Sequence, residues 1–344
     1  METEEYIQKL TQCCGISGFE DSLHPLLLDM LRPYCAQVWT DPFQSVAGYR
    51  PCGRGGAKKV MLEAHLDQIG LMVSAIDDNG MIAFENLGGV DPRILPMSEV
   101  KVLGKAGPVF GIVAPMPKQE DNPKENTAVQ IKDMRIDTGF TKAELKERIA
   151  IGCPIQLQMS TRTLLDGRMS ACAMDNRAGI AAILLTLEAL KDEMLPYDLY
   201  VLFSSQEELG LHGAYTGTHA LAPDFAVAID VTHGETPDAK DETGVFPLGS
   251  GAVICRGPNL DDRLAKTLIS LAEKYQIPYE IEVAAGASGT TAWAIQTSGA
   301  GIPTALVSIP LRYMHTHVET LEIQDVKAVA ALLTQALKGG SFSC

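Results

Sequence analysis

Hydrophobic positions near the start of the chain follow first a helical and then a strand pattern. Leu23 to Leu31 has the spacing of an amphipathic helix, and Lys58 to Ala64 reads as a buried strand that runs directly into His65. The two patterns alternate again after residue 175. The expected elements there are strands at 199–203, 225–229 and 304–309 and helices at 177–190, 262–275, 290–297 and 324–337. Strands that alternate with helices predict an α/β fold with a mostly parallel sheet covered by helices on both faces.

Between residues 71 and 160 the pattern changes to short β runs. These runs lie at 71–76, 81–84, 99–103, 109–113 and 155–159. Asn79-Gly80 between two of the runs is a strong hairpin signal, and the polar stretch from Lys118 to Asn126 predicts an exposed loop. We therefore expect a discontinuous catalytic domain, formed by residues 1–70 and 161–344, that is interrupted by a β-rich domain at 71–160.

Composition and charge limit the locations and partners that are expected for the chain. The chain has 344 residues, of which 46% are hydrophobic, and no run approaches the roughly 20 apolar residues that cross a bilayer. The acidic N-terminus lacks the features of an export signal, so a cytoplasmic location is expected, with the eight cysteines as reduced thiols. The net charge of −15 repels nucleic acid and anionic membranes, which disfavours both as partners. The same charge favours metal ions and substrates that carry an ammonium group.

Histidines and acids gather where the predicted strands end. They are His65 and Asp67 after the first strand, Glu207 and Glu208 after the second, Asp230 after the third, His315 after the last, and Asp175 at the start of a helix. Each residue has an ordinary explanation by itself, such as a core histidine, a helix N-cap or a turn residue. Ligands of α/β proteins, however, bind at the carboxyl ends of the strands, and so many acids at one edge would repel one another without cations. Imidazole and carboxylate together predict a metal site.

The spacing of these residues suggests different roles. Asp67 lies two positions after His65, so its carboxylate can hold the second imidazole nitrogen. Glu207 and Glu208 are adjacent and point to opposite sides of a continuing strand, so one can reach the metals while the other acts as a base. Asp175 at a helix start is short and rigidly held, which suits a carboxylate that bridges two ions.

Six segments, in this order and spacing, resemble the M42 family of metallo-aminopeptidases over nearly the whole chain. They are Glu63–Gly70, Gly88–Pro96, Met174–Gly179, Ser205–Gly210, Ile229–Thr232 and Arg312–His315. The resemblance implies two divalent ions per subunit, with zinc expected and cobalt or manganese as alternatives. It also implies that Asp175 bridges the ions, that Glu208 and His315 complete one site, that His65 and Asp230 complete the other, and that Glu207 is the general base. The β-rich domain would be a dimerisation domain, and dimers would assemble into a dodecameric tetrahedron.

Three positions depart from the family pattern. Gln68 stands where a glutamate is usual, Thr291 stands where an aspartate is usual, and His317 stands where a proline is common. Gln68 removes a charge close to the metal ligands. Thr291 lacks the carboxylate of the usual acid, so any role of that acid is in question here. The six ligand and base positions are all retained.

The expected reaction is hydrolysis of the N-terminal residue from short peptides. A water held between two cations about 3.5 to 4 Å apart gives up its proton near neutral pH, Glu207 accepts the proton, and the acidic cluster attracts the free N-terminal ammonium. A metallo-carboxypeptidase or N-acyl deacylase would use a similar ligand order, a glycoside hydrolase would need only two carboxylates, and a non-catalytic metal-binding scaffold would not need Glu207. The preferred first residue stays open, with Arg256 and Arg263 as candidates for binding an acidic side chain.

Overall fold

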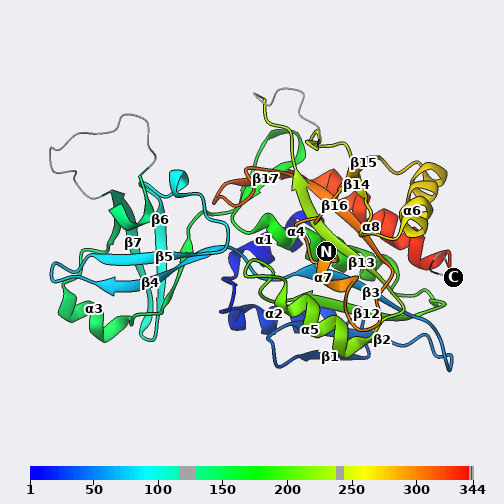
Figure 1. The fold of residues 1–344 in the computed structure, drawn as a ribbon, viewed down its shortest axis with the longest axis horizontal. Helices are drawn as coiled ribbons and strands as arrows, with labels where there is room; N and C mark the ends of the chain where they lie inside the picture. The colour runs from blue at the N-terminus through cyan, green and yellow to red at the C-terminus, as the bar shows by residue number, and fades with distance from the viewer. Residues whose placement is uncertain (116–128, 238–243, 341, 343–344) are drawn as a thin grey trace.

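A computed structural model describes residues 1–115, 129–237, 244–340 and 342. These residues form a large sheet with helices and, set apart from it at one end of the long axis, a β barrel (Figure 1). The loop expected at 118–126 lies outside the described ranges. No helix in the described part of the chain is long and apolar enough to cross a membrane.

The large sheet has eleven strands within the described residues. Nine follow one another in the order β1 (Gln37–Thr40), β2 (Val46–Arg50), β12 (Asp198–Ser204), β3 (Lys59–His65), β13 (Phe225–His233), β16 (Thr304–Arg312), β17 (Glu319–Glu322), β11 (Arg168–Ala171) and β10 (Arg162–Thr163), and β14 (Ala252–Arg256) with β15 (Tyr279–Val283) branches from β16.

The centre of this sheet is parallel. β12, β3, β13 and β16 run in the same direction, and β3 and β13 are buried along almost their whole length. Such burial on both faces is typical of parallel strands between helices. Around this centre β2 pairs antiparallel with β12, and β17 and β14 pair antiparallel with β16, whereas β15 pairs parallel with β14. The prediction of a mostly parallel sheet is therefore met in the centre, and the sheet as a whole is mixed.

Helices cover both faces of the sheet. They are α1 (Thr3–Gln12), α2 (His24–Leu31), α4 (Met174–Ala189), α5 (His212–Leu221), α6 (Asp262–Tyr275), α7 (Ala292–Ile295) and α8 (Ile323–Lys338). Val60 and Leu62 of β3 belong to the core under α1, α2, α4, α6 and α8, whereas Met61 between them belongs to the core under α5 and α7. This alternation follows from the two-residue period of a strand. α7 is one turn long, shorter than the helix expected at 290–297.

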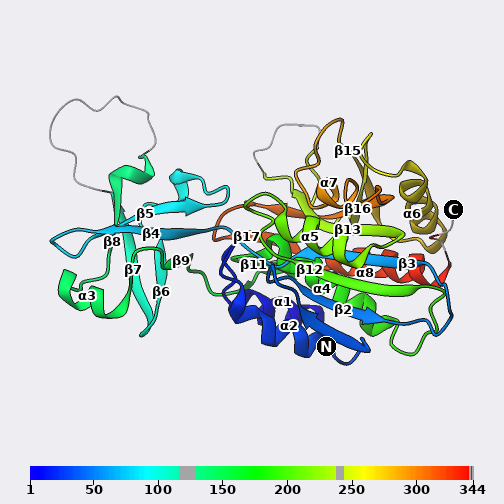
Figure 2. The same ribbon diagram turned by 60° about the horizontal axis from the view of Figure 1, so that its bottom comes forward.

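The segment between β3 and β10 folds as a closed antiparallel barrel, and a second view also shows it apart from the sheet (Figure 2). Its strands are, in spatial order, β4 (Gly70–Ile76), β5 (Ile82–Leu87), β8 (Met134–Asp137), β7 (Gly107–Pro115), β6 (Glu99–Gly104) and β9 (Pro154–Leu157). The barrel has its own hydrophobic core. It also includes a helix that the β pattern did not indicate, α3 (Lys142–Arg148), which begins with a capping box between Thr141 and Glu144.

Candidate metal centre

The parallel strands deliver the predicted site residues to one edge of the sheet. In the register of β3 with β12, His65 lies opposite Ser204, so these two strands end at the same level. The residues at this edge are His65 at the end of β3, Asp67 after it, Glu207 and Glu208 after β12, Asp230 within β13, and His315 in the turn after β16. The carboxyl ends of parallel strands are where ligands bind in such sheets. The structure thus brings these six residues together, and Asp175 joins them from the start of α4.

Three buried residues form the first potential metal group. His65, Asp175 and Asp230 each place a ligand atom within 4.8 Å of the others. His65 Nε2 lies 2.9 Å from Asp175 Oδ1 and 3.7 Å from Asp230 Oδ1. One imidazole and two carboxylates are a donor set that suits zinc, cobalt or manganese.

A second group shares Asp175 with the first. Asp175, Glu208 and His315 also place ligand atoms within 4.8 Å of one another. His315 Nε2 lies 3.5 Å from Asp175 Oδ2 and 3.4 Å from Glu208 Oε2. The two carboxylate oxygens of Asp175 therefore face different histidines, which is the arrangement that a bridging ligand requires.

Asp175 owes its position to an irregular start of α4. Asp175 and Asn176 have non-helical backbone angles, and the N-cap position belongs to Ala173, which has no side-chain cap hydrogen bond. Asn176 Nδ2 donates to the carbonyl of Ile229 on β13, so the start of α4 is tied to the strand that carries Asp230. The alternative reading of Asp175 as an ordinary N-cap does not describe this structure.

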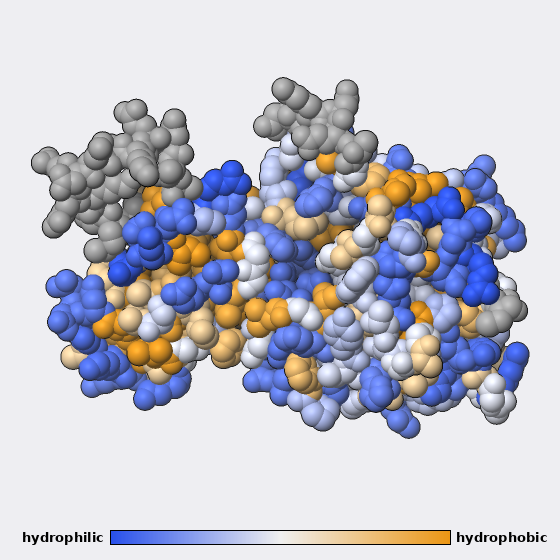
Figure 3. All heavy atoms as spheres, in the orientation of Figure 1, coloured by the Kyte–Doolittle hydropathy of each residue, from blue (hydrophilic) through white to orange (hydrophobic). Residues whose placement is uncertain are grey.

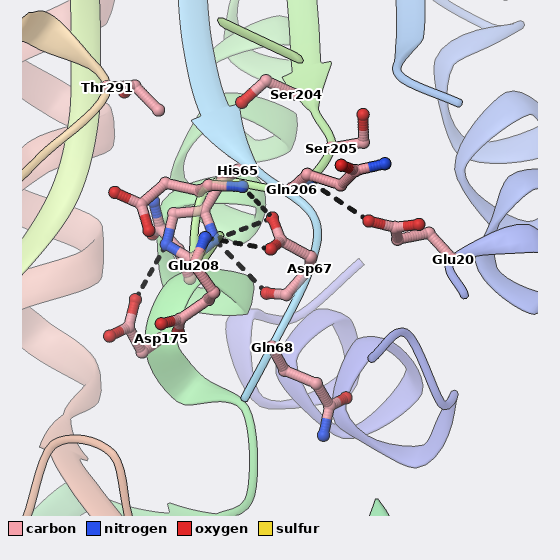
Figure 4. A network of polar contacts seen from close by, with 12 residues as sticks. Glu20, His65, Asp67, Gln68, Asp175, Ser204, Ser205, Gln206, Glu208 and Thr291 are labelled. Carbon is pink, nitrogen blue, oxygen red and sulfur yellow. Dashed lines mark hydrogen bonds and ion pairs between the residues drawn. The ribbon is translucent and has the colours of Figure 1, made fainter. Parts of the chain in front are cut away.

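Asp67 connects the end of β3 to the loop after β12. Its two carboxylate oxygens accept hydrogen bonds from the backbone N–H of Glu207 at 2.9 Å and of Glu208 at 3.1 Å. His65 Nδ1 lies 3.5 Å from Asp67 Oδ1 and 3.2 Å from the Asp67 carbonyl oxygen. Figure 4 shows His65 between Asp67 and Asp175. Asp67 thus orients His65 and fixes the backbone of both glutamates.

Glu207 and Glu208 point to different sides. Glu208 faces His315 and Asp175, whereas Glu207 lines a cavity of about 220 Å³ in front of His65 and Asp230. Glu208 is absent from the lining of that cavity and borders a much smaller one, of about 10 Å³, with Gln68 and Thr316. Of these two glutamates, Glu207 is therefore the one that borders the larger cavity.

Burial and crowding shift the ionisation of these acids. Burial, together with the surrounding carboxylates, raises the pKa of Glu207 and of Glu208 to about 8, and burial raises the pKa of Asp230 well above its ordinary value. Burial would also raise the pKa of Asp175, but hydrogen bonds with His315 and His65 outweigh it and leave that pKa below the usual range. Two histidines cannot neutralise so many carboxylates, and divalent cations would remove this cost. The residues present therefore fit a pair of metal ions.

Two supporting residues were not predicted from the sequence. Glu319 on β17 is buried, and its carboxylate accepts the backbone N–H of Asp175 at 3.2 Å and of His315 at 2.9 Å. Gly89, in the barrel segment, places its carbonyl oxygen 3.2 Å from His315 Nδ1. Glu319 joins the nearby amide of His315 to the amide of Asp175, which is distant in sequence, and no local pattern signals that role.

The three unusual positions lie around the centre. Gln68 Oε1 accepts a hydrogen bond from the buried Arg177 at 3.4 Å. Thr291 Oγ1 donates to the carboxylate of Glu63, a buried residue of β3 that also accepts from Ser204 Oγ at 2.5 Å. His317 does not line the 220 Å³ cavity. Thr291 thus serves as a partner of Glu63 where the family has an acid.

Comparison with known proteins identifies the family. The model of the M42 glutamyl aminopeptidases matches residues 48–332. The chain belongs to the M42 family. The lysyl aminopeptidase of Pyrococcus furiosus is 30% identical over 98% of this chain and 99% of its own length. M42 peptidases are metal-dependent aminopeptidases, so this chain is an aminopeptidase of that family.

Solved structures agree in fold with this M42 member. The aminopeptidase APDkam598 from the archaeon Desulfurococcus kamchatkensis superposes with a TM-score of 0.91 at 31% identity, covering 98% of this chain and 94% of that one. The Pyrococcus horikoshii TET1 peptidase, which can assemble into a tetrahedron or a large octahedral shell, gives a TM-score of 0.85 at 26% identity, covering 98% and 99%. The likeness thus includes both the sheet and the barrel.

Proposed function

We propose that the protein is a binuclear metallo-aminopeptidase that removes the first residue from short peptides with a free N-terminus. The observation that carries this proposal is the position of Asp175, whose two carboxylate oxygens face the imidazoles of His65 and His315. Each histidine belongs to a separate group of three potential ligands, and the two groups share only Asp175.

The ligand set divides between two ions. His65 and Asp230 would hold one ion, Glu208 and His315 would hold the other, and Asp175 would contact both. Zinc is the expected metal, with cobalt or manganese as alternatives. When bound, the two ions would polarise the scissile carbonyl and make a water acidic enough to lose a proton near neutral pH.

Glu207 is the general base in this proposal. It borders the same cavity as His65 and Asp230, and Asp67 holds its backbone N–H at 2.9 Å. Its carboxylate accepts the proton of the attacking water and later donates a proton to the departing amine. The surrounding carboxylates attract the free ammonium of a peptide, which restricts cleavage to the first residue. The family is named for glutamyl substrates and one relative for lysyl substrates. Membership of the M42 family therefore does not determine which first residue this chain prefers.

The division into a catalytic domain (1–70 and 161–344) and a dimerisation domain (71–160) completes the proposal. Hydrophobic side chains appear on the outside of the barrel half (Figure 3), and Met97, Phe110, Ile112 and Ile151 of this segment are more than half exposed. Exposed apolar surface favours association with a second copy. We propose that dimers assemble into a dodecamer, as the TET1 likeness suggests. A cytoplasmic location stays a prediction, and we expect neither nucleic acid nor membrane as a partner.

The test combines metal analysis with substrate chemistry. Metal-loaded protein should contain two ions per chain, lose activity on chelation, and cleave leucyl peptides but not their N-acetylated forms. A Glu207→Gln variant should keep both ions and lose hydrolysis. Glu280→Gln removes an exposed carboxylate of β15 and should keep both the ions and the hydrolysis. Equal cleavage of acetylated and free peptides would contradict the proposal, and light scattering that finds only monomers would contradict the assembly.

A further inference from the structure

The cavity in front of the metal ligands is also lined by residues outside the two ligand groups. They include Thr232, His233, Glu282, Ser288, Gly289 and Thr290, and Thr232 lies two residues beyond Asp230 on β13. The lining residues that the structure describes include no lysine and no arginine. Apart from Asp175, Asp230 and Glu207, Glu282 is the one carboxylate among them.

Glu282 is held in place by the strand that carries a metal-ligand residue. Thr232 Oγ1 donates a hydrogen bond to Glu282 Oε1 at 3.0 Å. Thr232 lies two residues after Asp230 on β13, so both side chains project from the same face, about 7 Å apart along the strand. Glu282 belongs to β15, so this hydrogen bond ties β15 to the strand that carries Asp230. The orientation of the carboxylate is therefore fixed relative to the metal centre.

Among the residues that the structure describes, neither the cavity lining nor the groups that act on the Glu282 carboxyl include a lysine or an arginine. The charged or titratable groups that face it are His233 on β13 and the thiol of Cys255 on β14. Burial raises the pKa of the Glu282 carboxyl, and its interactions with Thr232 and His233 only partly offset that rise. A cationic group beside this carboxylate would be favoured by charge and by a charge-assisted hydrogen bond.

The two arginines suggested by the sequence do not serve this cavity. Arg256 makes an ion pair with Asp262 at 2.5 Å, and Arg263 makes one with Asp261 at 2.9 Å. Neither lines the cavity. The structure thus has an acid in the cavity where the sequence analysis considered a basic residue. The expected preference therefore changes from an acidic to a basic first side chain.

We propose that Glu282 selects substrates whose first residue is lysine or arginine, an inference that rests on the aminopeptidase function proposed above. With the scissile carbonyl at the metal end, the first side chain extends along β13 towards Glu282. A lysine side chain spans roughly 6 Å from Cα to Nζ, since it contains five bonds of about 1.5 Å. This reach matches the two-residue spacing from Asp230 to Thr232. A glutamate side chain at the same place would meet a like charge.

A competing role for Glu282 would be to bind the α-ammonium that all substrates share. The two roles differ in their effect on specificity. Loss of a contact to the α-ammonium weakens every substrate equally, whereas loss of a contact to the side chain weakens only cationic substrates. The ratio of lysyl to leucyl hydrolysis therefore separates them.

The experiment measures kcat/KM of the full, zinc-loaded chain for lysyl, arginyl, leucyl and glutamyl aminomethylcoumarins. We expect the wild type to prefer the lysyl and arginyl substrates and to act least on the glutamyl one. Glu282→Gln should lower the lysyl-to-leucyl ratio roughly ten- to hundredfold, as loss of a hydrogen bond between charged groups does. Glu282→Lys should raise the glutamyl-to-lysyl ratio. Glu280→Gln, two residues earlier on the same strand but outside the cavity lining, is the matched control and should leave both ratios unchanged.

A binding measurement keeps the result independent of turnover. L-lysinol and L-leucinol share the amine but differ in side chain, and calorimetry on zinc-loaded protein should find lysinol bound at least tenfold more tightly by the wild type and about equally by Glu282→Gln. An unchanged ratio in Glu282→Gln, or an equal loss for all substrates, would overturn the inference. If the wild type hydrolysed no aminoacyl substrate, the proposed function would be wrong, and the ratio for the two amino alcohols would still decide the role of Glu282.

Discussion

His65 and His315 contact the two oxygens of one carboxylate, yet their surroundings differ sharply. His65 ends a buried central strand, and its side chain is 2% exposed. His315 lies in a turn with a left-handed φ of 60°, and its side chain is 35% exposed. The backbone of His65 is fixed by a central strand and its imidazole contacts Asp67, whereas His315 in its turn depends on Glu319 and Gly89. We therefore expect the outer group of Asp175, Glu208 and His315 to hold its ion less tightly than the inner group.

The largest effect should come from the residue that both groups share. Asp175→Asn keeps the shape of the side chain but removes the negative charge that faces both histidines. We expect the variant to lose both ions and all measurable hydrolysis, because each group is left with two ligands. Elemental analysis after desalting checks this expectation. Asp192→Asn changes an exposed aspartate and serves as control; an Asp175→Asn protein that kept one tight ion would show that the groups are independent.

The next effect should separate catalysis from metal binding. Glu207→Gln leaves both ligand groups intact but removes the proposed base, so kcat should fall by roughly 10² to 10⁴ while the metal content stays at the wild-type value. Steady-state kinetics with metal analysis of the same sample measures both quantities. A fall in metal content instead would mean that Glu207 is a ligand, and the assignment of the two glutamates would have to be exchanged.

A third change should remove only the outer ion. His315→Ala leaves the inner group complete, so we expect one ion per chain and strongly reduced hydrolysis. His65→Ala should weaken the inner ion and is the symmetric comparison. Loss of both ions from His315→Ala, with one ion retained by His65→Ala, would contradict the proposed difference between the inner and the outer group.

The smallest effect should come from the barrel side. A Cβ added at Gly89 would lie 2.7 Å from His315 Nδ1, so Gly89→Ala should displace the imidazole. We expect a ten- to hundredfold loss of affinity for the outer ion, the range typical of residues that orient a ligand. Competition with a chromogenic chelator measures this affinity. Gly55→Ala, where an added Cβ meets open space, is the control; equal weakening of both ions by Gly89→Ala would argue against a separate outer site.

The sequence predicted the inner half of the site better than its supports. His65 and Asp230 follow hydrophobic runs. Glu207 and Glu208 do face different sides, but they do so from the loop after β12, which ends at Ser204, and not from the continuing strand that the sequence argument assumed. Glu319 accepts the backbone N–H of His315, and Gly89 contacts its imidazole from the barrel segment; contacts with backbone atoms leave no periodic pattern. Glu282 was missed for a similar reason, because only the pairing of β15 with β14 brings it to the cavity.

The same division holds for the fold. Continuous apolar runs predicted the buried central strands, because parallel strands between two helical layers are apolar on both faces. The antiparallel edges were not predicted, since their short strands alternate or are partly exposed and carry no clear direction. The β-rich segment was recognised from its short runs, but the closure of a barrel depends on the pairing of β4 with β9, which lie far apart in the chain.

The most direct test of a binuclear centre is a zinc titration of the metal-free wild-type chain, followed by native mass spectrometry. Two ions should bind per chain in two resolved steps, the tighter to the inner group and the weaker to the outer group, and hydrolysis should rise with the second. Saturation at one ion per chain, with full activity at that point, would contradict the account.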